Sequence, residues 1–320
     1  MDSSASQNAS VIYDTPGNPA PENAITGFFE TPDGKRLRYA IFRSTVTRAT
    51  GTVVLLQGRN ETIEKYYETA RDLTEAGLWV ATFDWRGQGG SERLLDDSIA
   101  GHVRRFSDYQ NDLEFFLENI VLPDARLPFF VLGHSTGGLI ALATAPRLAN
   151  RVERMVVSAP FVGVHGGRFE LATLRTAVGF ASRFGFGRMS PAGSKQSNLS
   201  FEDNELTSDR ARFNRNRAIY ETCPQFILGG PTYRWLAESF RAIRRVQDPA
   251  HLASIRIPTL IFGAGADTIV PIEAIEDMAS HFRASELITI DRAKHELFQE
   301  ADIYREQTLA GIKAFLPGEL

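Results

Sequence analysis

The sequence has little cysteine, no long apolar run and no strong net charge. One cysteine in 320 residues excludes an intrachain disulfide and a metal site built from cysteines. No run of 18 or more apolar residues is present, so no membrane-spanning helix is expected. The first residues, MDSSASQNAS, lack the basic and apolar segments of a secretory signal. We therefore expect a cytoplasmic protein, with a peripheral position on the inner face of a membrane left open.

The charge and composition narrow the class of protein further. A formal net charge of −4 gives no overall attraction to nucleic acid, so no nucleic-acid partner is expected. Hydrophobic residues make up 43% of the chain and charged residues 23%, which is typical of a globular protein that buries a large core. The length allows two domains or one large α/β domain.

Short apolar runs and helical patterns alternate along the chain from Ile25 onward. The runs ITGFFET and RLRYAIF flank the turn PDGK and predict a β-hairpin. Continuous apolar runs predict six further strands: TVVLLQG (52–58), WVATFDW (79–85), PFFVLGH (128–134), RMVVSAP (154–160), PTLIFGAGAD (258–267) and ELITI (286–290). Helical patterns are found near residues 62–76, 108–120, 139–148, 273–281 and 302–316. This alternation predicts an α/β fold with a mostly parallel, eight-stranded sheet and flanking helices.

Two segments depart from this alternation. Residues 1–24 are small, polar and proline-rich, which predicts a flexible N-terminal tail or an extended arm. Residues 164–251 contain few branched runs and several glycine-rich turns. They predict a helical cap, inserted into a core formed by residues 25–163 and 252–320.

The predicted cap differs from the core in charge. Residues 164–251 carry a net charge of +5, and the rest of the chain carries −9. The difference favours contact between the cap and an anionic group or membrane surface, although solvated helix faces would give the same count. The cap also holds eight phenylalanines, most of which are expected to pack within it, and Cys223, expected to be a small buried apolar side chain.

One short motif indicates nucleophilic catalysis. Ser135 lies in the sequence GHSTGG, and the pattern G-x-S-x-G alone is weak. Here the first glycine ends a strongly apolar predicted strand and the second begins a predicted helix, which is the strand–turn–helix setting of a nucleophile elbow. The turn is tight enough to require small residues on both sides of the serine. The alternative is a glycine-rich turn with an incidental serine.

A serine hydroxyl needs a base and an acid to act as a nucleophile. The six histidines are at positions 102, 134, 165, 251, 281 and 295. In the elbow fold the chain order is serine, acid, histidine. His295 follows the last predicted strand and fits the base, whereas His134 fits a structural position beside the serine. Asp267 directly follows a predicted strand and fits the acid, which would hold the imidazole in the required tautomer.

Other carboxylates and glycine-rich stretches fit catalysis less well. Asp291 and Glu296 are too near His295 in sequence to orient its ring easily. GQGGS (87–91) lacks the lysine of a phosphate loop, and GAGAD lacks the third glycine of a dinucleotide fingerprint. Asp84 and Arg86 could be catalytic, but they are more simply explained as residues that hold the loop beneath the site. No metal or organic cofactor is expected.

An oxyanion hole needs two backbone N–H groups. We expect one from Thr136, directly after the nucleophile, and the other from Arg59, in the loop after TVVLLQG, where Gly58 allows a close approach. The side chain of Arg59 could also meet a substrate anion, although a solvated arginine is the simpler interpretation.

Five ordered motifs resemble one family of α/β-hydrolases. LLQGRNETIEKY, FDWRGQGGSERL, VLGHSTGG, LGGPTYRWL and AKHELFQEADIYREQ are similar to the bacterial lysophospholipases and monoacylglycerol lipases, the serine-aminopeptidase-like hydrolases. The resemblance covers about residues 25–317 and is greatest to the lysophospholipase branch. Gln57-Gly58 stands where monoacylglycerol lipases usually have His-Gly, which weakens that alternative.

The resemblance implies a fold, an activity and site residues. It implies an α/β-hydrolase fold with a helical cap, Ser135 as nucleophile, Asp267 as acid, His295 as base, and oxyanion donors at Arg59 and Thr136. It also implies hydrolysis of a single-chain acyl ester, with a lysophospholipid as the first expectation. A monoacylglycerol, a simple carboxylic ester or an N-terminal peptide are alternatives, as is a non-catalytic ligand-binding protein on a hydrolase fold.

Overall fold

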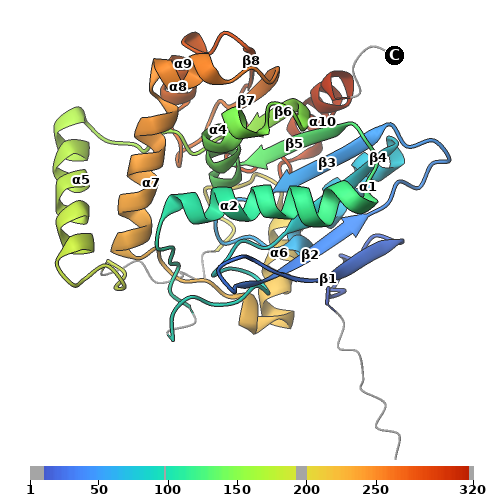
Figure 1. Cartoon of the computed structure of the whole chain (residues 1–320), viewed down its shortest axis with the longest axis horizontal. Coiled ribbons are helices and arrows are strands. Elements are labelled where there is room, and N and C mark those ends of the chain that lie inside the picture. The colour runs from blue at the N-terminus through green and yellow to red at the C-terminus, as the bar shows by residue number, and fades with distance from the viewer. Residues whose placement is uncertain (1–10, 97–98, 192–199, 317–320) are drawn as a thin grey trace, which may run out of the picture.

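The computed structural model describes residues 11–96, 99–191 and 200–316. Within these residues eight strands form one sheet in the order β1-β2-β4-β3-β5-β6-β7-β8 (Figure 1). Their bounds are β1 Ala24–Glu30, β2 Arg36–Phe42, β3 Gly51–Leu56, β4 Leu78–Phe83, β5 Phe129–His134, β6 Val152–Ser158, β7 Thr259–Ala264 and β8 Ser285–Ile290. β1 and β2 form an antiparallel hairpin, and β2 joins β4 antiparallel. All pairs from β4 through β8 are parallel, which confirms the predicted mostly parallel sheet.

Helices connect the parallel strands and fill the insertion. They are α1 Tyr67–Glu75, α2 Phe106–Phe116, α3 Leu122–Asp124, α4 Thr136–Leu148, α5 Arg168–Arg183, α6 Arg210–Thr222, α7 Tyr233–Val246, α8 Pro249–Ser254, α9 Ile272–Ser280 and α10 Asp302–Phe315. Shorter helical turns occupy Ile63–Tyr66, Leu117–Val121 and Pro224–Phe226. The helix predicted at residues 139–148 begins three residues earlier than expected, because the turn at Ser135 leads directly into it.

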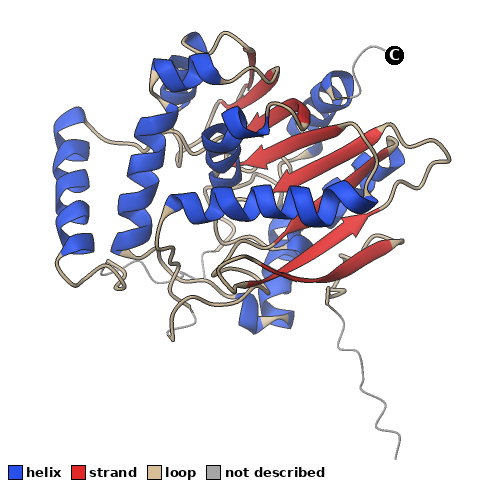
Figure 2. Ribbon diagram, viewed as in Figure 1, coloured by secondary structure: helices blue, strands red, loops and turns tan. Residues whose placement is uncertain are grey.

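The sheet separates two apolar layers, with helices on both faces (Figure 2). Successive side chains of a strand point to opposite faces. Val54 and Val131 therefore lie in one layer, with α2, α4, α7 and α9. Val53 and Leu132 lie in the other, with α1 and α10. Because β5, β7 and β8 are parallel, the loops that follow them lie at one edge of the sheet, where ligands of α/β proteins bind.

Residues 11–23 lie against the body of the protein, where the sequence left a flexible tail or an extended arm open. The Asn18 side chain donates a hydrogen bond to the backbone oxygen of Glu64 at 2.8 Å. The Tyr13 ring lies 5.6 Å from the Phe226 ring, edge to face, and Ile12 packs against the core. Composition alone could not decide between the two, because a proline-rich, polar segment does not reveal that a few of its side chains contact the core. Residues 1–10 lie outside the described residues.

The insertion between β6 and β7 is helical and carries α5, α6, α7 and α8. One face of α7 joins the main core through Trp235, Phe240 and Ile243. α5 packs against α7 and is the outermost element on that side of the molecule (Figure 1). The predicted boundaries between the core, residues 25–163 and 252–320, and the cap, residues 164–251, stay a prediction.

The eight phenylalanines of the insertion differ in burial, and Phe201 and Phe213 are half-buried. Phe226 and Phe240 are buried, and Phe226 packs with Cys223, which is buried as predicted. Four others on or after α5 are exposed, so the expectation that most of the eight pack within the insertion is wrong for half of them. They are Phe169, Phe180, Phe184 and Phe186. No helix of the described part of the chain has the length and apolarity needed to cross a membrane.

Candidate active site

Ser135 occupies a strained turn between β5 and α4. Its backbone has φ of 50° and ψ of −114°, a region that residues with a side chain rarely adopt. Its N–H donates to the carbonyl of Ser158 at 3.0 Å, and its carbonyl accepts from the N–H groups of Leu139 and Phe161, each at 3.0 Å. Three long-range or helical bonds therefore hold the residue in this conformation.

No side chain fits at the glycines two residues before and two residues after the serine. A Cβ atom on Gly133 would lie 2.9 Å from the backbone carbon of Gly137. A Cβ atom on Gly137 would lie 2.2 Å from the backbone oxygen of Leu56. Both distances are far below normal contact, so the turn and the end of β3 approach as closely as backbones can. This is the geometry that the sequence predicted for a nucleophile elbow.

The structure brings together the predicted base and acid. Asp267 follows β7 and His295 follows β8, and Oδ2 of Asp267 lies 2.6 Å from Nδ1 of His295. Oδ1 of Asp267 accepts the N–H groups of Ile269 and Val270 at 2.8 and 3.0 Å. Burial opposes ionisation of Asp267, but the bonds from His295 and these N–H groups hold its pKa below the ordinary value.

The imidazole of His295 lies beside the serine turn. Its ring centre is 5.0 Å from that of His134, the residue before Ser135. The Ser135 hydroxyl makes no hydrogen bond to any described residue, and the residue is 9% exposed. Because Nδ1 of His295 is bonded to Asp267, Nε2 is the nitrogen left for a proton transfer. In structures without substrate, the hydrogen bond between a catalytic serine and its histidine is often long.

The predicted oxyanion donors flank the same turn. Thr136 is the first residue of α4, so its N–H has no partner within the helix. The N–H of Arg59 likewise has no hydrogen-bond partner among the described residues, whereas the N–H of Gly58 donates to the Glu61 carboxylate. The close approach of Gly137 to Leu56 places the loop after β3 against the N-terminus of α4. The N–H of Gly58 is thus already bonded, whereas the N–H groups of Arg59 and Thr136 can donate to an oxyanion.

A buried charged cluster that the sequence analysis missed supports this loop. Lys65 donates to Glu61 at 2.8 Å and to Glu296 at 2.5 Å. Tyr66 donates its hydroxyl to Glu61 at 2.7 Å. The available signal was the four-residue spacing of Glu61 and Lys65, but that spacing alone indicates an ordinary surface pair. The cluster fixes Glu61, which in turn holds Gly58.

His134 has a structural position, as the sequence predicted. It is buried, and Nδ1 lies 3.2 Å from the backbone oxygen of Ser158. Burial lowers the pKa of His134 to about 4, so the ring is neutral at pH 7. A neutral ring beside His295 does not repel the imidazolium that would form during catalysis.

Asp84 and Arg86 hold loops together, as predicted. Oδ2 of Asp84 accepts from Arg38 at 2.8 Å and from the N–H of Gly90 at 2.7 Å. Arg86 pairs with both Asp33 and Asp112. Among the residues that the structure describes, no group of three or more histidine, cysteine, aspartate or glutamate side chains could hold a metal ion.

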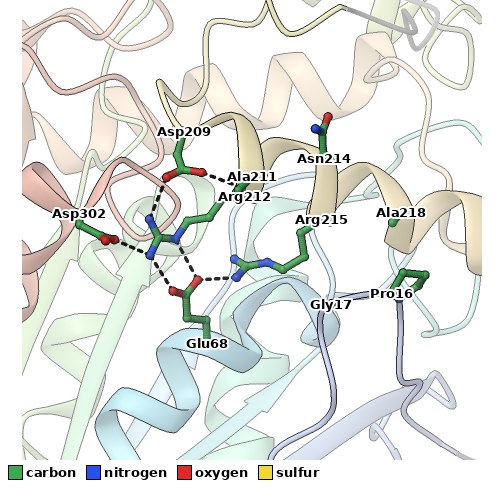
Figure 3. Close-up of a pocket in the computed structure, with 10 residues that line it drawn as sticks. All are labelled: Pro16, Gly17, Glu68, Asp209, Ala211, Arg212, Asn214, Arg215, Ala218 and Asp302. Atoms are coloured by element: carbon green, nitrogen blue, oxygen red, sulfur yellow. Dashed lines mark hydrogen bonds and ion pairs between the residues drawn. The ribbon is translucent and has the colours of Figure 1, made fainter.

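A surface cavity of about 640 Å³ lies between the N-terminal arm, α1, α6 and α10 (Figure 3). Its charged side chains pair with one another: Arg212 contacts Glu68 and Asp302 at 2.7 Å each, and Arg215 contacts Glu68 at 2.5 Å. None of the predicted catalytic residues lines it. We interpret the cluster as a link between α6 and the core.

Comparisons with known proteins identify the family of the chain. Residues 47–302 match the family described as serine aminopeptidase, S33. The sequence is 33% identical over 310 residues to lysophospholipase L2 of Escherichia coli strain K12, covering 92% of this chain and 86% of that protein. It is 32% identical over 268 residues to the probable lysophospholipase L2 of Haemophilus influenzae, covering 82% and 83%.

A solved structure supports the same fold. A soluble variant of monoglyceride lipase from Saccharomyces cerevisiae, in complex with a substrate analog, superposes with a TM-score of 0.74 at 20% identity and covers 97% of this chain and 98% of that chain. At this identity the likeness shows the fold alone. With the matched family and the lysophospholipase relatives, it shows that the chain belongs to the serine aminopeptidase S33 family of α/β-hydrolases and is a serine hydrolase of the lipase and esterase type.

Proposed function

We propose that this hydrolase cleaves the carboxylic ester of a lysophospholipid through an acyl-enzyme, with Ser135 as nucleophile, His295 as base and Asp267 as acid. One observation carries the catalytic part. A buried carboxylate–imidazole pair is 2.6 Å apart, and its imidazole lies 5.0 Å from the ring of His134, the residue before Ser135. Ser135 itself is held at φ of 50°, a conformation that persists only where the surrounding structure enforces it.

The first half of the reaction forms the acyl-enzyme. Oγ of Ser135 attacks the acyl carbonyl carbon, and Nε2 of His295 takes the hydroxyl proton. The carbonyl π electrons move to the oxygen, which the N–H groups of Arg59 and Thr136 stabilise. The carbonyl then reforms, the ester C–O bond breaks, and the departing glycerophospho-alcohol takes the proton from His295. Asp267 stabilises the imidazolium between these steps.

The second half releases the fatty acid. A water molecule attacks the acyl carbon while His295 takes one of its protons. The same N–H groups stabilise the second oxyanion, the bond from the acyl carbon to Oγ breaks, and His295 returns the proton to Ser135. Every step uses groups of the chain and water.

Two observations favour a lysophospholipid over a neutral ester. The relatives that are 32–33% identical over four-fifths or more of this chain carry lysophospholipase names, whereas a monoglyceride lipase homolog of monkeypox virus that matches 87% of the chain is 21% identical. The insertion carries a net charge of +5, which suits a phosphate-bearing head group. A monoacylglycerol or a simple carboxylic ester is the alternative substrate.

The exposed face of α5 supports contact with a lipid surface. Phe169 is 85% exposed, Phe180 61% and Phe184 59%, although exposed phenylalanines are unfavourable in water. The rings of Phe180 and Phe184 stack at 4.2 Å, and Arg175 and Arg183 lie on the same helix. Aromatic and basic side chains together are typical of helices that bind anionic membrane surfaces. A peripheral position on such a surface would bring the site to its substrate.

Replacement of the serine tests the catalytic part. Ser135→Ala should lower turnover of a short p-nitrophenyl ester by about 10⁶-fold, the scale for loss of a triad serine, and should abolish labelling by a fluorophosphonate probe. Ser280→Ala, at the exposed end of α9, is the matched control and should keep both. Undiminished turnover by folded Ser135→Ala would refute the proposal, and failure of the wild-type protein to label would favour a non-catalytic binding protein.

A substrate pair tests the choice of lipid. A 1-acyl lysophospholipid and a 1-acylglycerol of equal chain length, in mixed micelles of one neutral detergent, should give a higher kcat/KM for the lysophospholipid. A strong preference for the 1-acylglycerol would instead identify a monoacylglycerol lipase.

A further inference from the structure

Arg59 is a partly exposed residue whose guanidinium Nε is buried, and the group has no counter-charge among the described residues. Buried arginines of the described chain each pair with carboxylates: Arg38 with Glu64 and Asp84, Arg86 with Asp33 and Asp112, and Arg305 with Asp72. Arg59 has no carboxylate within 4 Å among the described residues. Its Nη2 donates to the backbone oxygen of Gly229, and a carbonyl oxygen carries no net charge.

The remaining donors of this side chain are free. Nε is buried and has no hydrogen-bond partner, and the described residues provide none for Nη1. Burial lowers the pKa of Arg59 to about 10, so the group is still charged at pH 7. A buried cation with unused donors is costly for the free protein. It becomes favourable once an anion binds there.

The guanidinium lies where the insertion meets the catalytic turn. Its Cζ is 5.3 Å from the ring centre of Trp235 on α7, and Trp235 stacks with Phe161 at 6.3 Å. Phe161 in turn donates its N–H to the carbonyl of Ser135. A Cβ atom on Gly101 would lie 2.5 Å from Nη2, so the loop at Gly101 encloses the group on another side.

Two other arginines that contact the insertion also bond to backbone oxygens. Arg93 donates to the backbone oxygens of Gly87 and Gln225, each at 2.7 Å. Arg234 donates to the backbone oxygen of Ser182 at 2.9 Å. Neither has a carboxylate within 4 Å among the described residues. These three arginines therefore bond to backbone oxygens, in contrast to the cavity at Glu68, where arginines pair with carboxylates.

We propose that the side chain of Arg59 binds the phosphate of a 1-acyl lysophospholipid while the backbone N–H of the same residue stabilises the oxyanion. The inference rests on the proposed function. Six covalent bonds separate the scissile carbonyl carbon from the phosphorus atom, and six separate the backbone nitrogen of an arginine from Cζ. The two spans are therefore similar, at about 7 Å when extended. The backbone N–H and the guanidinium of Arg59 can therefore contact the ester carbonyl and the phosphate of the same lipid.

The experiment compares two lipids in four proteins. Wild type, Arg59→Met, Arg59→Lys and Arg154→Met are assayed with 1-palmitoyl lysophosphatidylcholine and 1-palmitoylglycerol in the same mixed micelles. Arg154→Met is the matched control, because Arg154 also donates to a backbone oxygen, at 2.8 Å, and lies over an aromatic ring, at 5.2 Å. It lies on β6, where the partner is Phe315 near the end of α10.

The expected readout is the ratio of the two kcat/KM values, lysophospholipid over 1-palmitoylglycerol. This ratio should fall by at least about 10-fold in Arg59→Met, as expected for loss of a charged hydrogen bond. It should recover in part in Arg59→Lys and should stay unchanged in Arg154→Met. The melting temperature of Arg59→Met should equal or exceed that of wild type, because a buried charge without a partner is removed. A structural role would instead lower it.

Other outcomes separate the possible failures. Equal loss on both lipids, or an unchanged ratio, would overturn the role of the Arg59 side chain while Ser135 still hydrolyses esters. Absence of ester hydrolysis and of fluorophosphonate labelling in wild type would overturn the proposed function itself. Inorganic phosphate is tested as an inhibitor of 1-palmitoylglycerol hydrolysis. Inhibition that Arg59→Met removes, with an unchanged lipid ratio, would assign the site to free phosphate and overturn the head-group proposal.

Discussion

At the residue scale, the catalytic turn depends on the absence of side chains as much as on the serine. Ser135 adopts a positive φ because β5, α4 and the loop after β6 fix its backbone from both directions. Gly133 and Gly137 let these segments approach. Larger residues there would force the turn away from the end of β3, and the expected oxyanion donors Arg59 and Thr136 would separate.

Gly137→Ala should therefore damage the protein more than its small size suggests. A Cβ atom there would lie 2.2 Å from Leu56 O and 2.6 Å from Gln57 O, both rigid backbone atoms, so we expect destabilisation of about 2 kcal/mol or more, typical of overpacking. Urea unfolding measures this loss, and turnover of a soluble ester should fall with it.

Gly179→Ala is the control for this prediction. Gly179 also lies within a helix, α5, but a Cβ atom there would meet no heavy atom within 4 Å. Alanine should be neutral or stabilise the protein by up to about 1 kcal/mol, from helix propensity alone. Equal effects of the two substitutions would show that the close approach at Gly137 does not constrain the turn.

At the element scale, the helices of the insertion differ in how they are held. α7 buries one face in the main core, and α6 is tied to α1 by the pairs between Glu68 and its arginines. Among the side chains described along α5, only Val178 and Ser182 are buried. A helix with so little burial gains from a further contact, which we propose to be a lipid surface.

Replacement of the stacked pair on α5 tests this contact. The double variant Phe180→Ser and Phe184→Ser should bind vesicles of anionic phospholipid at least about 10-fold more weakly, because two apolar rings no longer leave water. The measurement is vesicle cosedimentation, with vesicle turnover expressed relative to turnover of a soluble ester. Ile303→Ser, at an exposed position of α10, should bind as wild type does. Loss of binding in both variants would exclude a specific role for α5.

At the scale of the whole molecule, buried His134 and half-buried His102 should make the stability depend on pH. Burial lowers the pKa of both His134 and His102 to about 4, from an ordinary 6.5. The unfolded chain therefore binds more protons than the folded one between these values, so stability is greatest above pH 6.5 and falls as the pH drops toward 4.

The prediction is quantitative for His134, which is fully enclosed. At about 1.4 kcal/mol for each pKa unit, it contributes up to about 3 kcal/mol of this loss. Urea unfolding at pH 7.5, 5.5 and 4.5 measures it. His134→Gln should show a shallower dependence, whatever its stability at pH 7.5. Parallel pH dependence in the two proteins would show that other groups cause the acid loss.

The sequence predicted the sheet, its order of elements and the residues of the candidate triad, because each is encoded locally. Apolar runs identify buried strands, and G-x-S-x-G between a strand and a helix identifies a sharp turn. Parallel strands then bring the segments that carry Asp267 and His295 to the same edge. The pair at 2.6 Å has the geometry that this reasoning requires.

Tertiary structure alone decided which charges are paired. Lys65 joins Glu61 to Glu296, which lies 231 positions after Lys65 in the sequence. Arg59 donates to the backbone oxygen of Gly229, 170 positions away, and pairs with no carboxylate among the described residues. In the sequence Arg59 was most simply a solvated side chain, and residues 11–23 were either a flexible tail or an extended arm. The state of a charge depends on the segments that enclose it, and these are brought together only when the chain packs.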